Sequence, residues 1–543
     1  MKKASIWLTL LAACLALAPA AASAQDNNEM LGSVGFNLHG YYRARWFNYF
    51  NPGWLTPNAA DKSNYWEFLD QRLVLLPTLT ISDPIKVVME ANILDNVQWG
   101  DNTVTQTPAV QTTRPPSNPS AVSAVNATTI NFFNGSVFSH MMSDTNTSGT
   151  DINPFEIRQL YAQLTLPIGW FRIGRQGANW GMGIQDNSGS PYSRFLEKQG
   201  DVSDRNSGFD NNGGDNYDRI LFASRIADFY YPMLYYDRIA DGDFKTGTDD
   251  VNSLTFANQF RDIHFADTGQ FDGGFFIRMR EQIASRASLW FYDAWGRLQY
   301  SGFLWEVEGV AYQGRATFFS DHDVATIRSY GYPVGQGGGV VHIEAYNVAG
   351  RFKYDAGRWG AGLETGFSTP SAANPNDEYS QTAQNVVVAA KQALGLDPQN
   401  PTAKTAFTNA VVMNQQAFGR RISTVAFNPE YKIDLIGWDQ LMGGALVNGV
   451  FFKAGGYVHP LDGMLVRLDE IDSYVNQPDI DRNGRASSRG VGWETDLNYA
   501  YTFYKQFTLD LKLGYMLPGQ YFRDNFLQVR NVFSWQFRTI VNF

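Results

Sequence analysis

The most constraining feature of this sequence is a two-residue alternation of apolar and polar side chains over stretches of about ten residues. At the end of the chain one face of such a stretch carries Phe533, Trp535, Phe537, Thr539, Val541 and Phe543, and the other carries Ser534, Gln536, Arg538, Ile540 and Asn542. Strands of soluble sheets also alternate, but they are usually about half as long. About ten alternating residues are the length that a tilted strand needs to cross a bilayer.

The same alternation recurs along the chain. The other stretches with this pattern are 34–46, 290–300, 303–311, 345–354, 359–367, 491–503 and 507–517. An arginine or lysine that faces hydrocarbon at the midplane costs about 2–4 kcal/mol, so the charged face of each stretch is expected to line an interior. Only helices and closed barrels pair every backbone group inside a bilayer. The pattern therefore predicts an all-β fold, a transmembrane antiparallel up-and-down β-barrel.

Turn residues divide the predicted strands asymmetrically. We expect short turns at 82–84, 167–169, 355–357 and 460–463, and long polar connections at 99–153, 184–216, 239–272, 369–443 and 475–488. Short turns at one end and long loops at the other are typical of outer-membrane barrels. The predicted count is about 16 strands, and 217–285 and 420–458 leave it open between about 14 and 18. An even count places both chain ends on the periplasmic side.

The first 24 residues have the composition of an export signal. Lys2 and Lys3 precede an apolar stretch at 4–17, and Ala22-Ser23-Ala24 forms a small-residue cleavage site. We therefore expect a signal peptide over 1–24 and an outer-membrane β-barrel over 25–543. The only cysteine, Cys14, lies in this segment, and the alternative is a lipid-attachment site there. A mature chain without cysteine has no disulfide bonds.

Composition narrows the classes of partner. The chain of 543 residues has a formal net charge of −10, which argues against a nucleic-acid partner. Beyond the first 24 residues no stretch gives about 20 continuous apolar residues, so membrane-spanning helices are not expected. Aromatic residues make up 15% of the chain, which is too many for a disordered protein.

Two segments inside the long external loop 369–443 have helical rather than strand periodicity. They are 377–394, followed by Gly395, and 402–418, which begins at Thr402 as a helix cap and is followed by Gly419. One interpretation of this helical hairpin, 377–418, is a lid that lies on the rim of the barrel. The other is a loop folded into the lumen as a constriction or gate, whose deletion would raise conductance.

Eighteen charged residues on the polar faces are predicted to line a pore. They are Arg43, Arg45, Asp70, Arg72, Glu90, Arg172, Asp293, Arg297, Glu306, Glu308, Arg351, Lys353, Glu364, Glu494, Asp496, Asp510, Lys512 and Arg538. Because the two signs nearly balance, strong ion selectivity is not expected. The alternative is an ion-paired interior that plugs a narrow barrel, whereas about sixteen strands leave an aqueous channel unless loops fill it.

Signals for enzymatic or metal chemistry are sparse, so we predict no enzyme, no catalytic residue and no cofactor. The six histidines accompany no serine motif: His39, His140, His264, His322, His342 and His459. Asp321-His322-Asp323 is best interpreted as a solvated loop. The acidic loop from Asp210 through Asp215 to Asp218 offers hard oxygens for Ca²⁺ but lacks the spacing of an EF-hand.

Several motifs resemble those of known barrels. Arg158 and the Gly174-Arg175-Gln176 strand are similar to Gram-negative porins and to alginate-export-type barrels, and 493–496, 514–515 and 518–522 resemble the last hairpin of the latter. Strict alternation points Arg175 toward lipid, so we expect a bulge or a strand end there. The resemblance implies the outer membrane of a Gram-negative bacterium. It also implies that the barrel-assembly machinery recognises the terminal Phe543.

These observations favour a passive outer-membrane channel for the diffusion or export of small hydrophilic solutes or saccharides. Tyr41 and Tyr161, which lie on polar faces, would suit stacking against sugars. The alternative is a structural or adhesive surface barrel that acts through its loops. A hydrolase is disfavoured because no Ser–His pair is recognisable. Outer-membrane lipid and a small solute are the expected partners, and nothing in the sequence indicates the oligomeric state.

Overall fold

The structure is a computed structural model that describes residues 34–51, 65–98, 155–190, 214–240, 250–283, 286–317, 340–370, 421–442, 444–478, 486–504, 506–525 and 529–543. Its strands are β1 (Gly35–Phe50), β2 (Tyr65–Ser82), β3 (Ile85–Gln98), β4 (Phe155–Leu166), β5 (Gly169–Gly177), β6 (Asn216–Ser224), β7 (Tyr230–Ala240), β8 (Val251–Phe265), β9 (Gly269–Gln282), β10 (Ala287–Tyr300), β11 (Phe303–Thr317), β12 (Val340–Asp355), β13 (Trp359–Ser368), β14 (Arg421–Ile422), β15 (Gly449–Val458), β16 (Met464–Val475), β17 (Gly490–Phe503), β18 (Phe507–Pro518) and β19 (Val532–Asn542). A π-helix, η4 (Gly437–Leu441), and a short helix, α6 (Gln520–Asn525), complete the described elements.

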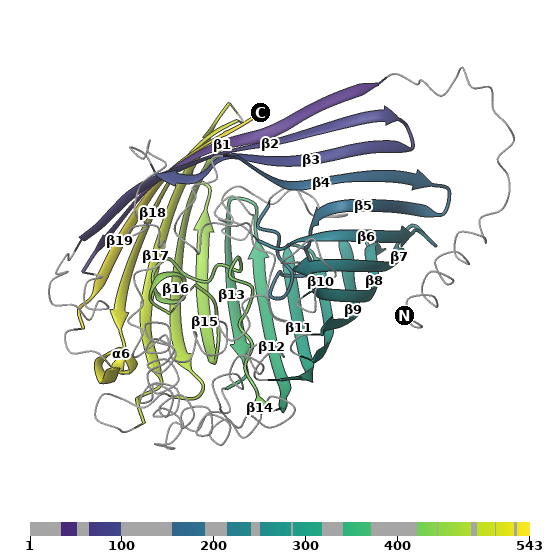
Figure 1. The fold of residues 1–543 in the computed structure, drawn as a ribbon. Helices are drawn as coiled ribbons and strands as arrows, with labels where there is room; N and C mark the ends of the chain where they lie inside the picture. The colour runs from purple at the N-terminus through teal and green to yellow at the C-terminus, as the bar shows by residue number, and fades with distance from the viewer. Residues whose placement is uncertain are drawn as a thin grey trace, which may run out of the picture.

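The strands form one closed antiparallel barrel. Each wall strand pairs with its neighbours in chain order, and β1 closes the ring by pairing with both β2 and β19. Figure 1 shows this path, which runs from the purple β1 round to the yellow β19 at its side. The two-residue β14 pairs with β12 in parallel and adds no wall strand, because β13 pairs directly with β15. The described wall therefore has eighteen strands.

This count corrects the prediction of about 16 strands, although it falls within the expected range. The strand β8 lies inside 239–272, which the sequence analysis took for a loop, so that expectation is wrong. By its register the outward face carries the amides Asn252 and Asn258 on either side of the apolar Leu254 and Phe256, and Asn258 is buried there. That mixture weakens the apolar signal on which the assignment of strands depends.

The outer wall exposes a band of large apolar side chains. Phe36, Leu363 and Trp493 are 68%, 60% and 46% exposed, while their polar neighbours on the same strands point inward. A continuous apolar surface of this size has to be covered, and lipid covers it in a membrane barrel. No helix in the part of the chain that the structure describes is long and apolar enough to span a membrane.

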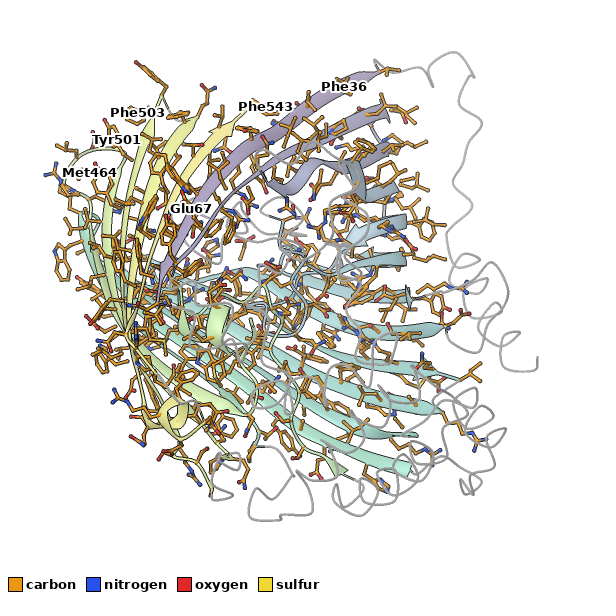
Figure 2. The ribbon with its side chains drawn as sticks, turned by 60° about the vertical axis from the view of Figure 1, so that its left-hand side comes forward. Phe36, Glu67, Met464, Tyr501, Phe503 and Phe543 are labelled. Atoms are coloured by element: carbon orange, nitrogen blue, oxygen red, sulfur yellow. The ribbon has the colours of Figure 1, made fainter. Side chains whose placement is uncertain are left out.

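The two ends of the barrel differ. One end holds the start of β1, the end of β19 and the short connections 83–84, 167–168, 225–229, 266–268, 301–302, 356–358, 459–463 and 504–506. In Figure 2, Phe36, Phe543, Met464, Tyr501 and Phe503 lie at this end, and Glu67 lies toward the other. The backbone groups of Gly40 and Phe543 exchange two hydrogen bonds of 3.0 Å, which ties the end of the chain to β1. The barrel strands therefore begin and end on the same side, as predicted. The connections at the opposite end are longer, except for the short one between Gln282 and Ala287.

Candidate functional site

The inner wall carries all eighteen charged side chains that the sequence predicts to line a pore. Fourteen of them are buried, namely Arg43, Arg45, Asp70, Arg72, Glu90, Asp293, Glu306, Glu308, Glu364, Glu494, Asp496, Asp510, Lys512 and Arg538. Arg172, Arg297, Arg351 and Lys353 are partly buried on the same face. Neighbouring groups therefore cover most of this charge, and a permeation path along it is a proposal.

Ion pairs between neighbouring strands neutralise part of this charge. Arg45 binds Asp70 through two hydrogen bonds of 2.9 and 2.6 Å. On β11, Glu306 accepts hydrogen bonds from both Arg297, at 2.7 Å, and Arg351. Buried pairs of this kind replace the water that charged groups lose when the barrel closes.

The sector formed by β18, β19, β1 and β2 combines like charges. The strand register places Arg43 opposite Arg72 and Arg45 opposite Arg538. Asp510 contacts Arg538 and lies 3.7 Å from the ammonium group of Lys512, so one carboxylate serves two cations there. Cations outnumber carboxylates in this sector, although the predicted set as a whole is nearly balanced.

A second set of arginines points inward that the sequence analysis did not predict to line the interior, although it named Arg158 as part of a porin-like motif. Its members are Arg158, Arg219, Arg261, Arg278 and Arg280, all of them buried. Most of the set lies within 217–285, where strand boundaries were hard to place. The available signal was β9, on which Arg278 and Arg280 alternate with the exposed Phe275 and Ile277.

The connection after β5 folds into the barrel rather than over its rim. We call residues 178–190 loop one. Its tip, from Trp180 to Gly183, lies on the inner wall at β10 and β11: the indole N–H of Trp180 donates to Asp293 at 2.9 Å, and the backbone N–H of Gly183 donates to Glu308 at 3.0 Å. The backbone N–H of Met182 donates to the same Glu308 oxygen. A carboxylate that accepts several N–H groups makes charge-assisted hydrogen bonds, which are stronger than neutral ones.

Glycine is required at the tip of loop one. Gly181 and Gly183 have φ of +51° and +87°, where L side chains are strained. A Cβ atom on Gly181 would lie 2.6 Å from Oε2 of Glu308. These two glycines allow the backbone to turn directly against the carboxylate.

Further contacts hold loop one across a wide arc of the wall, from β3 to β11. Asp186 binds Arg278 on β9 through a bidentate ion pair, one arm of which measures 2.8 Å. Tyr312 on β11 donates to Gln185 at 2.6 Å, and Ser190 donates to Glu90 on β3 at 2.8 Å. Burial by itself would raise the pKa of Asp186, but the charge and hydrogen bonds of Arg278 outweigh it and lower the pKa to about 2.

A second segment, described over residues 423–442 and 444–448, also lies inside the barrel, and we call it loop two. One carboxylate, that of Glu494 on β17, accepts the backbone N–H groups of Leu435, Ile436 and Gly437 at 2.8–2.9 Å. These N–H groups belong to the start of η4, where the helix leaves them without partners of its own. Asp434 accepts the next N–H groups, those of Trp438 and Asp439.

The wall holds loop two at further points. Tyr431 donates to Glu364 on β13 at 2.7 Å, Lys453 on β15 donates to the carbonyl of Ile433 at 2.9 Å, and Trp438 donates to Ser473 on β16 at 3.0 Å. Much of this segment belongs to the connection 369–443, which the sequence analysis placed outside the barrel. The helical hairpin predicted over 377–418 lies outside the described residues.

Loop one and loop two fill much of the interior that the structure describes. Their apolar side chains pack with inward wall residues into one cluster that includes Trp180, Ile184, Phe427, Ile436 and Trp438. Beside loop one, a cavity of about 40 Å³ is lined by Gln159, Tyr161, Arg172, Asn179, Arg219 and neighbouring side chains. In it, the Arg172 guanidinium lies 5.1 Å from the centre of the Tyr161 ring. This cavity thus combines charged, amide and aromatic side chains.

Arg175 and Asp218 of the nearby acidic loop have no part in the interior charge. Arg175 faces outward two residues before the end of β5, as expected for a strand end, and pairs with Asp218 on β6 at 2.9 Å. Asp218 is exposed, whereas Asp215 is buried and turns inward, so the two carboxylates of the suggested Ca²⁺ loop diverge. Residues 210–213 lie outside the described ranges. Among the residues that are described, no cluster of three or more candidate metal ligands occurs.

The fold and this interior define a membrane-spanning β-barrel with a polar lumen that two loops constrict. No family model and no curated protein matches the sequence. Solved structures with a similar outline include OccK9 (OpdG) of Pseudomonas aeruginosa, with 9% identity, a TM-score of 0.47, and 94% of this chain and 98% of that chain covered.

Two other similar structures are named as outer-membrane proteins or porins. The outer membrane protein OpdK of Pseudomonas aeruginosa has 8% identity, a TM-score of 0.44, and 93% and 99% coverage of the two chains. A BenF-like porin of Pseudomonas fluorescens Pf-5 has 8% identity, a TM-score of 0.46, and 94% and 98% coverage. The alginate-export resemblance stays a prediction. Identities and scores this low assign neither a family nor a solute to the chain.

Proposed function

We propose that this protein is an outer-membrane channel of a Gram-negative bacterium that lets small hydrophilic solutes diffuse through its lumen. The observation that carries the proposal is the closed eighteen-stranded wall, which exposes apolar side chains outside and holds charged side chains inside. A barrel of this circumference leaves an aqueous path wherever loops do not fill it. The lining charges replace part of the water shell of a passing solute.

The mode of attachment of the two loops supports a channel rather than a solid plug. Loop one and loop two are held to the wall by carboxylate–N–H contacts at Glu308 and Glu494, which water can replace when a loop swings away. These polar contacts can exchange with water, and the apolar cluster that the loops share with the wall has to be separated as well. We infer that the loops set the size of the solute and that the eighteen predicted inward charges face its path.

Saccharides are the solute class that we propose within this function. The cavity beside loop one presents the Tyr161 ring, the Gln159 and Asn179 amides and the Arg172 guanidinium. Aromatic faces stack on sugar rings, and amides both donate to and accept from hydroxyl groups. We also propose that Phe543, which lies at the closing seam of the barrel, serves as the assembly signal that its terminal position suggests.

Liposome swelling tests the function with a graded set of solutes. Purified protein reconstituted into liposomes should admit a pentose faster than a disaccharide, and a trisaccharide slowest, because two loops narrow the lumen. Liposomes that carry heat-unfolded protein are the control. If the protein liposomes swell no faster than that control for any solute, the chain is no channel, and the surface-barrel alternative gains support. Equal rates for a sugar and a non-sugar of the same size would overturn the saccharide proposal alone.

A further inference from the structure

We propose that Asn428 couples loop one to loop two, so that the two loops leave the lumen together as one gate. This inference deepens the proposed channel function and rests on it. In that function Asn428 is a positioning residue. It does not contact the solute, and it affects the solute path by joining the two loops.

Asn428 of loop two uses its hydrogen-bond donors across the junction between the loops. Its backbone N–H donates to the carbonyl of Ile184 in loop one at 2.8 Å. Its amide Nδ2 donates to the carboxylate of Asp215 at 2.7 Å and to the carbonyl of Gln185 at 3.2 Å. Because the side chain is 1% exposed, water does not compete for these bonds.

Asp215 extends the junction to the far end of loop one. The carboxylate oxygen that accepts from Asn428 also accepts the backbone N–H of Asn187 at 3.2 Å. The backbone N–H of Asp215 donates in turn to the carbonyl of Asn187 at 2.8 Å. Asp215 is fully buried, so its charge depends on these donors. Separating Asn428 from Asp215 therefore disturbs loop one as well as loop two.

Asn428 is also held rigidly within its own loop. Its Oδ1 accepts the backbone N–H of Glu430 at 2.9 Å, and its carbonyl accepts the backbone N–H of Tyr431 at 3.0 Å. Tyr431 binds Glu364 on β13, so the turn at Asn428 is continuous with a wall contact of loop two. A displacement of loop two is thereby transmitted to Asn428, because the hydrogen-bonded turn beside it does not deform independently.

The main wall contacts of the two loops are separate, which makes coupling measurable. Loop one is held at β9–β11 through Arg278, Asp293 and Glu308, and loop two at β17 through Glu494. Weakening one contact leaves the other intact. A response of the second loop then passes through the Asn428 junction or through the apolar cluster that both loops share, and substitution of Asn428 distinguishes these two routes. Coupling between two sites is reciprocal.

Hydrogen exchange of the full-length protein in nanodiscs tests the coupling without relying on conduction. Glu494→Gln removes the charged acceptor of loop two, and we expect faster exchange over 423–448 and also about tenfold faster exchange over 178–190. In the Asn428→Ala background the same substitution should accelerate 423–448 and leave 178–190 unchanged. Glu308→Gln should act in the reverse direction. Equal acceleration of 178–190 in both backgrounds, or none in either, overturns the proposal.

Exchange of the amide and the carboxylate between positions 428 and 215 distinguishes a loss of coupling from unfolding of the variant. Asn428→Asp alone brings a second carboxylate against Asp215 and should uncouple the loops. Adding Asp215→Asn removes this repulsion, because the new amide at position 215 donates to the new carboxylate at position 428. The double swap should restore the response of 178–190 to Glu494→Gln. Failure of the swap to restore it, in a protein whose wall strands exchange normally, contradicts the proposed junction.

Single-channel recording separates the two proposals. If the barrel conducts, the native protein should gate in one step, and Asn428→Ala should add intermediate conductance levels. A silent bilayer defeats the channel function, while the exchange experiment still decides whether the loops are coupled. A conducting protein with the same levels in both forms defeats the coupling alone.

Discussion

Single side chains decide how the loops of this barrel are held. Glu308 and Glu494 do the same work at two separate places on the wall, since each gathers backbone N–H groups from a loop that enters the lumen. A buried carboxylate without such donors would be costly, and a loop whose N–H groups lacked an acceptor would be equally so. Each glutamate therefore provides the hydrogen-bond acceptor for the N–H groups of its loop, and these N–H groups stabilise its buried charge.

Asp186 gives a pH dependence with a definite sign. Its pKa in the folded protein is lowered to about 2 by Arg278, against the raising effect of burial, from an ordinary value of about 3.9. A lowered pKa contributes stability that is complete above about pH 4 and is lost as the pH falls toward about 2. The native protein should thus exceed Asp186→Asn in free energy of unfolding by about 2 kcal/mol at pH 7.

Urea titration followed by tryptophan fluorescence measures this difference at pH 7, 4, 3 and 2. It should stay constant from pH 7 to about 4 and shrink below that. The control is Asp218→Asn, which breaks an exposed pair on the outer wall and should change stability by at most about 1 kcal/mol. A difference for Asp186→Asn that grows on acidification would contradict the assigned ion pair.

The strands could be predicted from sequence much better than the loops. Alternation identifies β1, β10–β13 and β17–β19. One face of these strands meets lipid and the other meets the lumen, so successive residues are apolar and polar in the sequence itself. β8 fails this criterion, since Asn252 and Asn258 lie on its outward face. Because β8 was not predicted as a strand, its inward Arg261 was not predicted either, and the other inward arginines of that region were also missed.

The path of the loops could not be predicted, for a physical reason. A polar connection has the same composition whether water or a charged lumen surrounds it. The contacts that draw it inward join residues far apart in the chain: Glu308 and Gly183 are separated by 125 positions. Four glycines of the two loops, Gly181, Gly183, Gly189 and Gly444, have positive φ, and they are the local sign of tight turns there.

The tip of loop one gives a prediction about this element as a whole. Gly181→Ala places a side chain at φ +51° and within 2.6 Å of the Glu308 carboxylate, whereas Gly357→Ala meets the comparable strain of φ +82° with no atom within 4 Å. Both substitutions cost roughly 1 kcal/mol in backbone strain. Only Gly181→Ala should also detach the loop and accelerate hydrogen exchange over 178–190. Equal exchange over 178–190 in the two variants would refute the contact with Glu308.

The whole molecule is a charged tube whose sectors differ. Around β1, Arg43 stands opposite Arg72, so a glutamate at position 43 would face a cation and the barrel should still fold. Under a KCl gradient, Arg43→Glu should move the reversal potential toward cation preference, because the field of the lining charges sets ion selectivity. Arg315→Glu, on the exposed outer face of β11, is the matched control. An unchanged reversal potential would place Arg43 away from the path of the ions.

Conductance of the purified protein in planar bilayers tests the central claim, a lumen that conducts past two anchored loops. The native protein should give discrete current steps, and the Glu308→Gln, Glu494→Gln double variant should give larger or longer-lived steps, because both loops lose their charged acceptors. Glu281→Gln, exposed at the end of β9, should match the native protein. Bilayers that stay silent at high protein, for the native and the double variant alike, would show that this barrel is not a channel.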